Sequence, residues 1–247
     1  AGATLFTTGD STKALLAAML AARTPGATLT KAPEFVEAFD DFCVYEGLIE
    51  LPNYQHGEAP YLETGGGWTE GDAGALVLND RVASRIVLTI PRSPMPKDGY
   101  PAAVFIRTGG GGDRPLVDRG VHATPHGEST VPGTGPGYEI ARVGVAGISI
   151  DGPHGGIRNI SKADEQFLTY NVVNPEALRD NIRQSALEIA LLPDLLATLT
   201  VSPGACPGAS PTAVSFNPKR LAVMGHSMGA TIAPLVLAAE PRYGATV

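Results

Sequence analysis

Apolar residues follow two different periods along the chain, and these periods predict its elements. Residues 43–51 alternate between apolar and polar positions and stop at Pro52, which is typical of a strand. Short apolar runs at 85–90, 102–107, 144–150 and 220–224 predict four more strands. A proline-rich connection, residues 92–101, links the first two of these runs.

Three stretches have the spacing of helices instead. Residues 11–23 place four apolar side chains at helical spacing, and residues 230–239 form a helix-like run. The best-defined helix begins at Asn174, which can cap it, and Pro175 fits its first turn. Its apolar stripe continues to Leu196, and Pro193 is expected to kink the helix or end its first part.

From residue 102 onward, strands and helices alternate, which predicts an α/β fold with a mostly parallel sheet flanked by helices. Each of the three strands in this part is followed by a glycine-rich loop, namely 109–112, 151–156 and 225–229. Ligands of such sheets bind beyond the carboxyl ends of the strands. We therefore expect the three loops to meet at one edge of the sheet.

The strongest chemical motif is Gly-His-Ser-Met-Gly at residues 225–229. It matches the G-x-S-x-G nucleophile elbow and lies between an apolar strand and a helix, as that motif requires. A serine hydroxyl needs a sharp turn that exposes it, a base and oxyanion donors before it can attack a carbonyl. The motif indicates Ser227 as a nucleophile; the alternative is a glycine-rich turn with an incidental serine.

The loop at residues 109–112 consists of four glycines directly after a strand. Glycines there allow backbone N–H groups to approach a developing oxyanion. We predict the N–H groups of Gly110 and Met228 as the oxyanion donors, with Gly109 and Gly111 in the surrounding pocket. A flexible loop tip is the alternative. A phosphate-binding loop is not indicated, because no Lys-Ser/Thr pair follows the glycines.

Other polar residues near these loops have weaker patterns. Asp151 is expected to organise its own loop through hydrogen bonds to the backbone, and His154 to line the pocket or orient that loop. His226 precedes the nucleophile, so the turn is expected to aim it differently from Ser227, as a residue of the pocket or of its supporting surroundings. His56, His122 and His126 fall in polar segments and are expected at the surface, the latter two near the cleft. No histidine pair has metal-binding spacing, so neither metal nor cofactor is predicted.

The composition of the chain argues against two classes of partner, nucleic acid and membrane. The chain has 247 residues, 43% of them hydrophobic, and a net charge of −7 without a basic cluster, so nucleic acid is not an expected partner. No apolar run approaches the roughly 18 residues that span a bilayer. Two cysteines, Cys43 and Cys206, leave two alternatives, a single disulfide formed in an oxidising compartment or two free thiols.

Together the elbow, the glycine loop and the element order over residues 85–247 resemble the α/β-hydrolase superfamily. The segments 151–156, 179–185 and 217–229 are more narrowly similar to bacterial secreted esterases and lipases. This resemblance implies an esterase in which residues 1–80 form an N-terminal extension that packs on a hydrolase domain at 81–247. It also implies a secreted or periplasmic protein whose signal peptide has been removed.

In that superfamily the triad acid and histidine follow the serine along the chain. Only 20 residues follow Ser227, and Glu240 is the one acidic residue among them. The resemblance therefore implies that later strands, the acid and the histidine come from outside this chain, from a cleaved C-terminal segment of the same precursor or from a partner chain. The competing hypotheses are a non-catalytic binding or structural protein with the same fold and, among enzymes, a thioesterase or peptidase.

Overall fold

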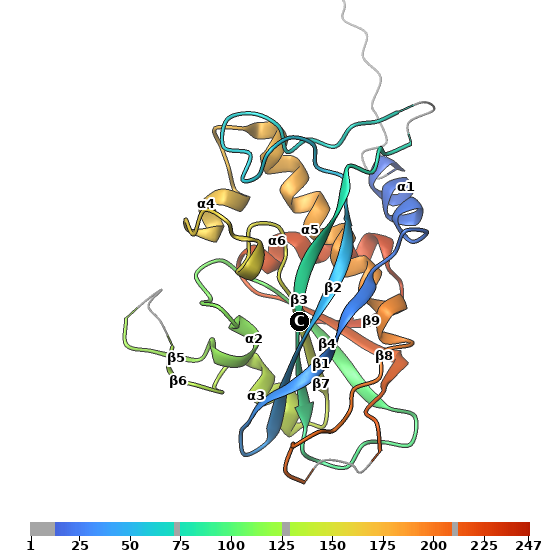
Figure 1. Cartoon of the computed structure of the whole chain (residues 1–247), viewed down its shortest axis with the longest axis vertical. Helices are drawn as coiled ribbons and strands as arrows, with labels where there is room; N and C mark the ends of the chain where they lie inside the picture. Colours follow the sequence, from blue (N-terminus) through green and yellow to red (C-terminus); the bar gives the residue numbers. More distant parts are fainter. Residues whose placement is uncertain (1–12, 72–74, 125–128, 209–211) are drawn as a thin grey trace, which may run out of the picture.

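The computed structural model describes residues 13–71, 75–124, 129–208 and 212–247. Its centre is a seven-stranded sheet in the order β1-β2-β3-β7-β4-β8-β9 (Figure 1). The strands of this sheet are β1 (Thr28–Ala38), β2 (Phe42–Asn53), β3 (Asp80–Pro91), β4 (Tyr100–Ile106), β7 (Ala146–Ile150), β8 (Phe216–Gly225) and β9 (Tyr243–Thr246). The strands β5 (Val121–His122) and β6 (Ser129–Val131) form a separate pair. The helices are α1 (Lys13–Ala22), α2 (Pro115–Asp118), α3 (Pro136–Arg142), α4 (Glu165–Thr169), α5 (Pro175–Leu196) and α6 (Met228–Ala239).

The sheet is mixed, and its pairing changes once, at β7, from antiparallel to parallel. Strands β1, β2, β3 and β7 pair in antiparallel fashion, whereas β7, β4, β8 and β9 pair in parallel. Because β7, β4 and β8 are parallel neighbours, the three glycine-rich loops that follow them lie at one edge of the sheet. The prediction that these loops meet is confirmed.

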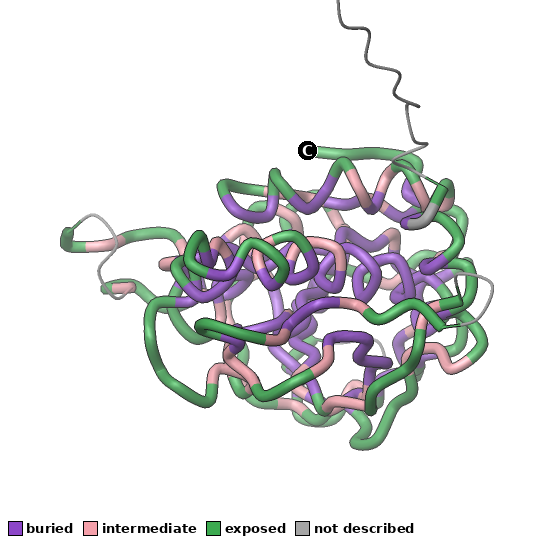
Figure 2. The backbone as a smooth tube through the Cα atoms, turned by 90° about the horizontal axis from the view of Figure 1, so that it is seen from above, coloured by how far each residue is buried: buried purple, intermediate pink, exposed green. Residues whose placement is uncertain are grey.

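Helices cover both faces of the sheet. Helices α1, α5 and α6 share one hydrophobic core with it, and α2 and α3 pack on the opposite face (Figure 1). Strand β2 shows how one sequence serves both faces: Cys43 and Tyr45 belong to the first core, while Phe42 and Val44 belong to the second. Figure 2 shows the buried positions gathered in the middle of the molecule and exposed turns around them.

The five strands expected from apolar runs are all present, as β2, β3, β4, β7 and β8. Strand β1 was not expected, because most of its side chains are exposed and it has only one buried position. It lies at the edge of the sheet, where one-sided pairing with β2 is enough to hold it. Residues 28–53 thus extend the sheet that contains the later strands.

Helix α5 continues through Pro193 to Leu196, although this proline was expected to kink the helix or end its first part. A proline cannot donate a hydrogen bond to the carbonyl four residues earlier, which is that of Ile189. The hydroxyl of Tyr243 on β9 donates to this carbonyl at 2.9 Å. The tertiary contact supplies the missing donor, so the helix need not end there.

A disulfide joins Cys43 on β2 to Cys206 in the loop between α5 and β8. Close by, the hydroxyl of Tyr45 donates to the carbonyl of Pro203 at 2.5 Å. Both contacts fasten the long loop to the sheet. No described helix combines the length and apolar composition that crossing a bilayer requires.

Candidate active site

Ser227 lies on a strained bend between β8 and α6. Its φ and ψ are 53° and −117°, a region that residues with a side chain rarely occupy. The bend also needs glycine on both sides. A Cβ at position 225 would lie 2.6 Å from the carbonyl oxygen of Gly229, and a Cβ at position 229 would lie 2.9 Å from that of Ile106. The sequence Gly-x-Ser-x-Gly is thus required sterically by this turn.

The turn exposes Ser227 and places the Met228 amide at the start of α6. Ser227 is exposed, whereas Met228 behind it is buried. Met228 is the first residue of α6, where N–H groups have no partner inside the helix. Among the described residues, none accepts a hydrogen bond from the Met228 N–H or from the Ser227 hydroxyl.

The 109–112 loop follows β4, the neighbour of β8 in the sheet. Gly110 and Gly112 have φ values of 66° and 73°, and a Cβ on Gly109 would lie 2.7 Å from the Cβ of Gln166. Within the described part of the chain, no group accepts a hydrogen bond from the four N–H groups of this loop. The loop therefore presents several unpaired donors beside the serine turn.

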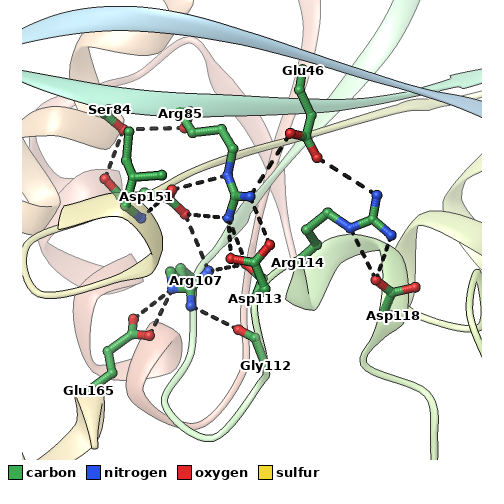
Figure 3. A network of polar contacts seen from close by, with 11 residues as sticks. Glu46, Ser84, Arg85, Arg107, Gly112, Asp113, Arg114, Asp118, Asp151 and Glu165 are labelled. Carbon is green, nitrogen blue, oxygen red and sulfur yellow. Dashed lines mark hydrogen bonds and ion pairs between the residues drawn. The ribbon is translucent and has the colours of Figure 1, made fainter. Parts of the chain in front are cut away.

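Two arginines hold the carbonyl side of this loop (Figure 3). Arg107, at the end of β4, donates from Nη2 to the carbonyl of Gly112 at 2.8 Å and from Nη1 to the carbonyl of Asp113 at 2.7 Å. Arg85 on β3 donates to the same Asp113 carbonyl at 2.9 Å and to its carboxylate at 2.8 Å. Because the arginines bind the carbonyls of Gly112 and Asp113, they fix this end of the loop without using the N–H groups of residues 109–112.

The arginines are in turn held by buried carboxylates. The Nε of Arg107 donates to both carboxylate oxygens of Glu165 on α4, at 2.9 and 2.8 Å. Burial raises the pKa of Glu165 to about 7, although the neighbouring Arg107 favours its ionised form. The pKa of Asp113 is lowered, chiefly by its hydrogen bond to Arg85. The loop is thus anchored to β3, β4 and α4 by a continuous network of charges.

Asp151 lies inside this network, 2% exposed, at the end of β7. Its carboxylate pairs with Arg85 at 3.1 Å and Arg107 at 3.3 Å, and it accepts a hydrogen bond from the Ile157 N–H at 3.1 Å. A Cβ on Gly156 would lie 2.1 Å from the same carboxyl group. Asp151 therefore connects its own glycine-rich loop with the arginines that hold the 109–112 loop.

His154 lines a different cavity from the one that Gly110 and His226 border. It is buried, its φ is 63°, and its Nε2 is 3.1 Å from the Oδ1 of Asn181 on α5. Its ring packs edge-on against Tyr61 and lines a cavity of about 240 Å³ together with this tyrosine. Burial lowers the pKa of His154 to about 4, although the hydrogen bond with Asn181 acts in the opposite direction. The imidazole is therefore neutral at physiological pH.

His226 is exposed and lines a cavity of about 540 Å³ together with Gly110 and His122. A second cavity, of about 600 Å³, is lined by residues 110–112, Gly156 and Glu165 among others. Gly110 borders both cavities, so open space flanks the 109–112 loop on two sides. His56, the remaining described histidine, lies elsewhere, with its Nε2 3.2 Å from the Val77 carbonyl. The prediction for His126 lies outside the described residues.

The structure brings Ser227, Met228 and the 109–112 loop to the ends of adjacent strands, with Asp151 behind the loop. Sequence reasoning missed Arg85, Arg107 and Glu165. An arginine that ends a buried strand immediately before a run of glycines could have indicated Arg107, because such a side chain needs buried acceptors. Among the described residues, no group of three or more histidine, cysteine or acidic side chains is arranged to hold a metal ion.

Neither a family model nor a curated protein matches this sequence. Solved structures do match. The acetyl xylan esterase from Paenibacillus sp. R4 has a TM-score of 0.53 and 12% sequence identity, over 98% of this chain and 60% of that one. A Bacteroides fragilis NCTC 9343 protein proposed to be an acetyl xylan esterase has a TM-score of 0.50 and 14% identity, over 95% of this chain and 51% of that one.

These similarities define the class of fold. The mixed sheet with flanking helices is the α/β-hydrolase fold of these two neighbours. The chain spans about half to three-fifths of the length of the two neighbours. At such identities the comparison assigns a fold, and function has to be argued from the site.

Proposed function

We propose that this protein is a serine hydrolase that cleaves carboxylic esters through an acyl-enzyme on Ser227. The observation that carries the proposal is the exposed serine on a strained bend, beside backbone N–H groups without an acceptor among the described residues. Strain of this kind costs roughly 1–3 kcal/mol and persists where the surrounding structure enforces it, often at functional sites. The esterase names of the two structural neighbours support the same activity.

In the proposed reaction, the Oγ of Ser227 attacks the carbonyl carbon of the ester while its proton passes to an imidazole base. The N–H groups of Gly110 and Met228 stabilise the oxyanion of the tetrahedral intermediate, because fixed dipoles need no reorganisation as the charge develops. The intermediate collapses, the alcohol leaves with the proton, and an acyl-serine remains. Water then attacks the acyl carbon by the same route and releases the acid.

The imidazole base and its carboxylate partner are proposed to come from a segment outside these 247 residues, either a C-terminal part of the same precursor or a partner chain. His154 is a poor candidate for the base, because it is buried against Asn181 and Tyr61. Glu240 is fully buried and paired with Arg23 and Arg242. Strand β9 lies at the edge of the sheet, where a further strand could pair.

Acetyl esters of carbohydrates are the first substrates to test, because both structural neighbours are named for acetyl xylan. The Cys43–Cys206 disulfide supports a secreted or periplasmic location, since disulfides persist in oxidising compartments. A thioesterase or peptidase would use the same turn and loop, because the nucleophile does not fix the leaving group. A non-catalytic protein with this fold is the alternative from another class.

Replacement of the nucleophile tests the proposal. Ser227→Ala should abolish turnover of 4-nitrophenyl acetate and labelling by a fluorophosphonate probe, whereas Ser202→Ala, at an exposed serine in another loop, should change neither. Labelling that persists in Ser227→Ala would disprove the assignment. Size-exclusion chromatography tests the source of the base: a monomer of this chain that is stable and active alone would overturn the proposed partner segment.

A further inference from the structure

Arg119, just after α2, differs from the other arginines in its partners. Most arginines of the described chain pair with a carboxylate; examples are Arg107 with Glu165 and Arg158 with Glu188. Arg119 has no such pair among the described residues. Its side chain makes a single hydrogen bond there, from Nη1 to the Gly109 carbonyl at 3.3 Å.

The remaining exceptions are explained by their surroundings. Arg92 donates to three backbone carbonyls, of Phe39, Asp40 and Pro207. Arg220 is exposed, and water can solvate its charge. Arg119 is half-buried, so a guanidinium with most of its donors unused needs another acceptor to offset its lost hydration.

Arg119 lines the cavity of about 540 Å³ that Gly110 and His226 also border. The other lining residues are Gly120, His122, Ala123 and Thr124, so none of the described residues that line this cavity is acidic. The chain as a whole carries a net charge of −7. Although the protein is acidic overall, the guanidinium gives this cavity a local preference for anions.

The guanidinium also lies close to the proposed reaction centre. Its Nη1 is 3.3 Å from the position that a Cβ on Gly111 would occupy, so it packs against the 109–112 loop. A single hydrogen bond of 3.3 Å to this loop is long for an N–H···O contact. The C-terminal end of the loop is already held by closer donors, with Arg107 bound to the Gly112 carbonyl and Arg85 to the carbonyl of the following Asp113. A clamping role would therefore leave most of the Arg119 donors without a function.

We infer that this cavity binds a carboxylate group carried by the ester substrate, and that Arg119 determines this specificity. The inference rests on the proposed function, because it places the carboxylate on a molecule whose ester reaches Ser227. A guanidinium holds a carboxylate through two parallel N–H···O bonds, which fix orientation as well as charge. Carboxylate-bearing esters should thus be preferred over neutral esters of the same shape.

Two pairs of isosteric substrates test the preference. Monoethyl succinate and ethyl succinamate differ only in a carboxylate or carboxamide on the acyl side. Acetoxyacetate and acetoxyacetamide differ in the same way on the alcohol side. In at least one pair the active full protein should show a kcat/KM about 10-fold or more higher for the carboxylate, chiefly through KM, as expected for a charge-assisted pair. No preference in either pair would overturn the inference.

Variants assign the preference to Arg119. Arg119→Gln should remove the preference and leave kcat for the carboxamide substrates within about twofold, while Arg119→Lys should retain part of it. Arg220→Gln, at the exposed arginine, should behave as the unmodified protein. A preference that persists in Arg119→Gln, or an equal loss of kcat on charged and neutral esters, would overturn the specificity role.

Measuring ligand binding tests the carboxylate site independently of the proposed ester hydrolysis. Ligand-observed NMR with the Ser227→Ala chain needs no turnover and should detect monoethyl succinate or acetoxyacetate, with weaker binding in Ser227→Ala/Arg119→Gln. If these ligands bind but no ester is hydrolysed by the unmodified protein, the proposed function fails and the carboxylate site stands. If esters are hydrolysed but neither carboxylate binds, the carboxylate site fails alone.

Discussion

The strain at Ser227 can be measured independently of any reaction. Ser227→Gly and Ser227→Ala both remove the hydroxyl, but only alanine keeps the Cβ that disfavours a φ of 53° with a ψ of −117°. Relief of this strain should stabilise the glycine variant by roughly 1–3 kcal/mol. The greater freedom of glycine in the unfolded chain offsets about 0.5–1 kcal/mol. The free energy of unfolding of the glycine variant should therefore exceed that of the alanine variant by about 1 kcal/mol, and by about 2.5 kcal/mol at most.

Equilibrium unfolding in urea at 25 °C measures this difference for the two variants. The matched control is Ser202, which is exposed and has no positive φ, so Ser202→Gly should be less stable than Ser202→Ala. The difference in free energy of unfolding between the glycine and the alanine variant should therefore be positive at position 227 and negative at position 202. A glycine variant at 227 that is as stable as, or less stable than, its alanine counterpart would refute the idea that the bend stores strain.

Three further predictions concern the structure around the site. Replacing Cys43 and Cys206 by alanine should lower the free energy of unfolding by up to about 5 kcal/mol, because the disulfide closes a loop of 163 residues; a urea midpoint unchanged from that of the oxidised protein would contradict this. Because burial raises the pKa of Glu165 to about 7, the folded protein retains a proton that the unfolded chain releases near its ordinary pKa. Stability should therefore fall by up to about 3 kcal/mol as pH rises from about 5 to 8, and Glu165→Gln should flatten this dependence; parallel curves for the two proteins would exclude it. Gly225→Ala should cost about 1–3 kcal/mol, because its Cβ would meet a backbone oxygen at 2.6 Å, whereas Gly244→Ala, with no atom within 4 Å of its Cβ, should be nearly neutral in thermal unfolding.

Local sequence determined the elements whose signals are local. The apolar runs of β2, β3, β4, β7 and β8 identify these strands because a buried strand needs an apolar side chain at each inward position. The serine turn is equally local, since its two glycines are required by backbone atoms close to the turn. From the order of these elements followed the parallel pairing and the meeting of three loops at one edge.

Only the tertiary structure decided features that depend on distant partners. Strand β1 has no apolar alternation and exists because β2 pairs with it. Helix α5 passes Pro193 because Tyr243, 54 residues from Ile189 in sequence, donates to the Ile189 carbonyl that the proline leaves without a donor. The 109–112 loop has N–H groups without an acceptor among the described residues, because Arg107 and Arg85, held by Glu165 and Asp151, fix its end through the carbonyls of Gly112 and Asp113. A charged side chain in a sequence does not specify which distant partner will hold it, so these contacts are set by the folded chain.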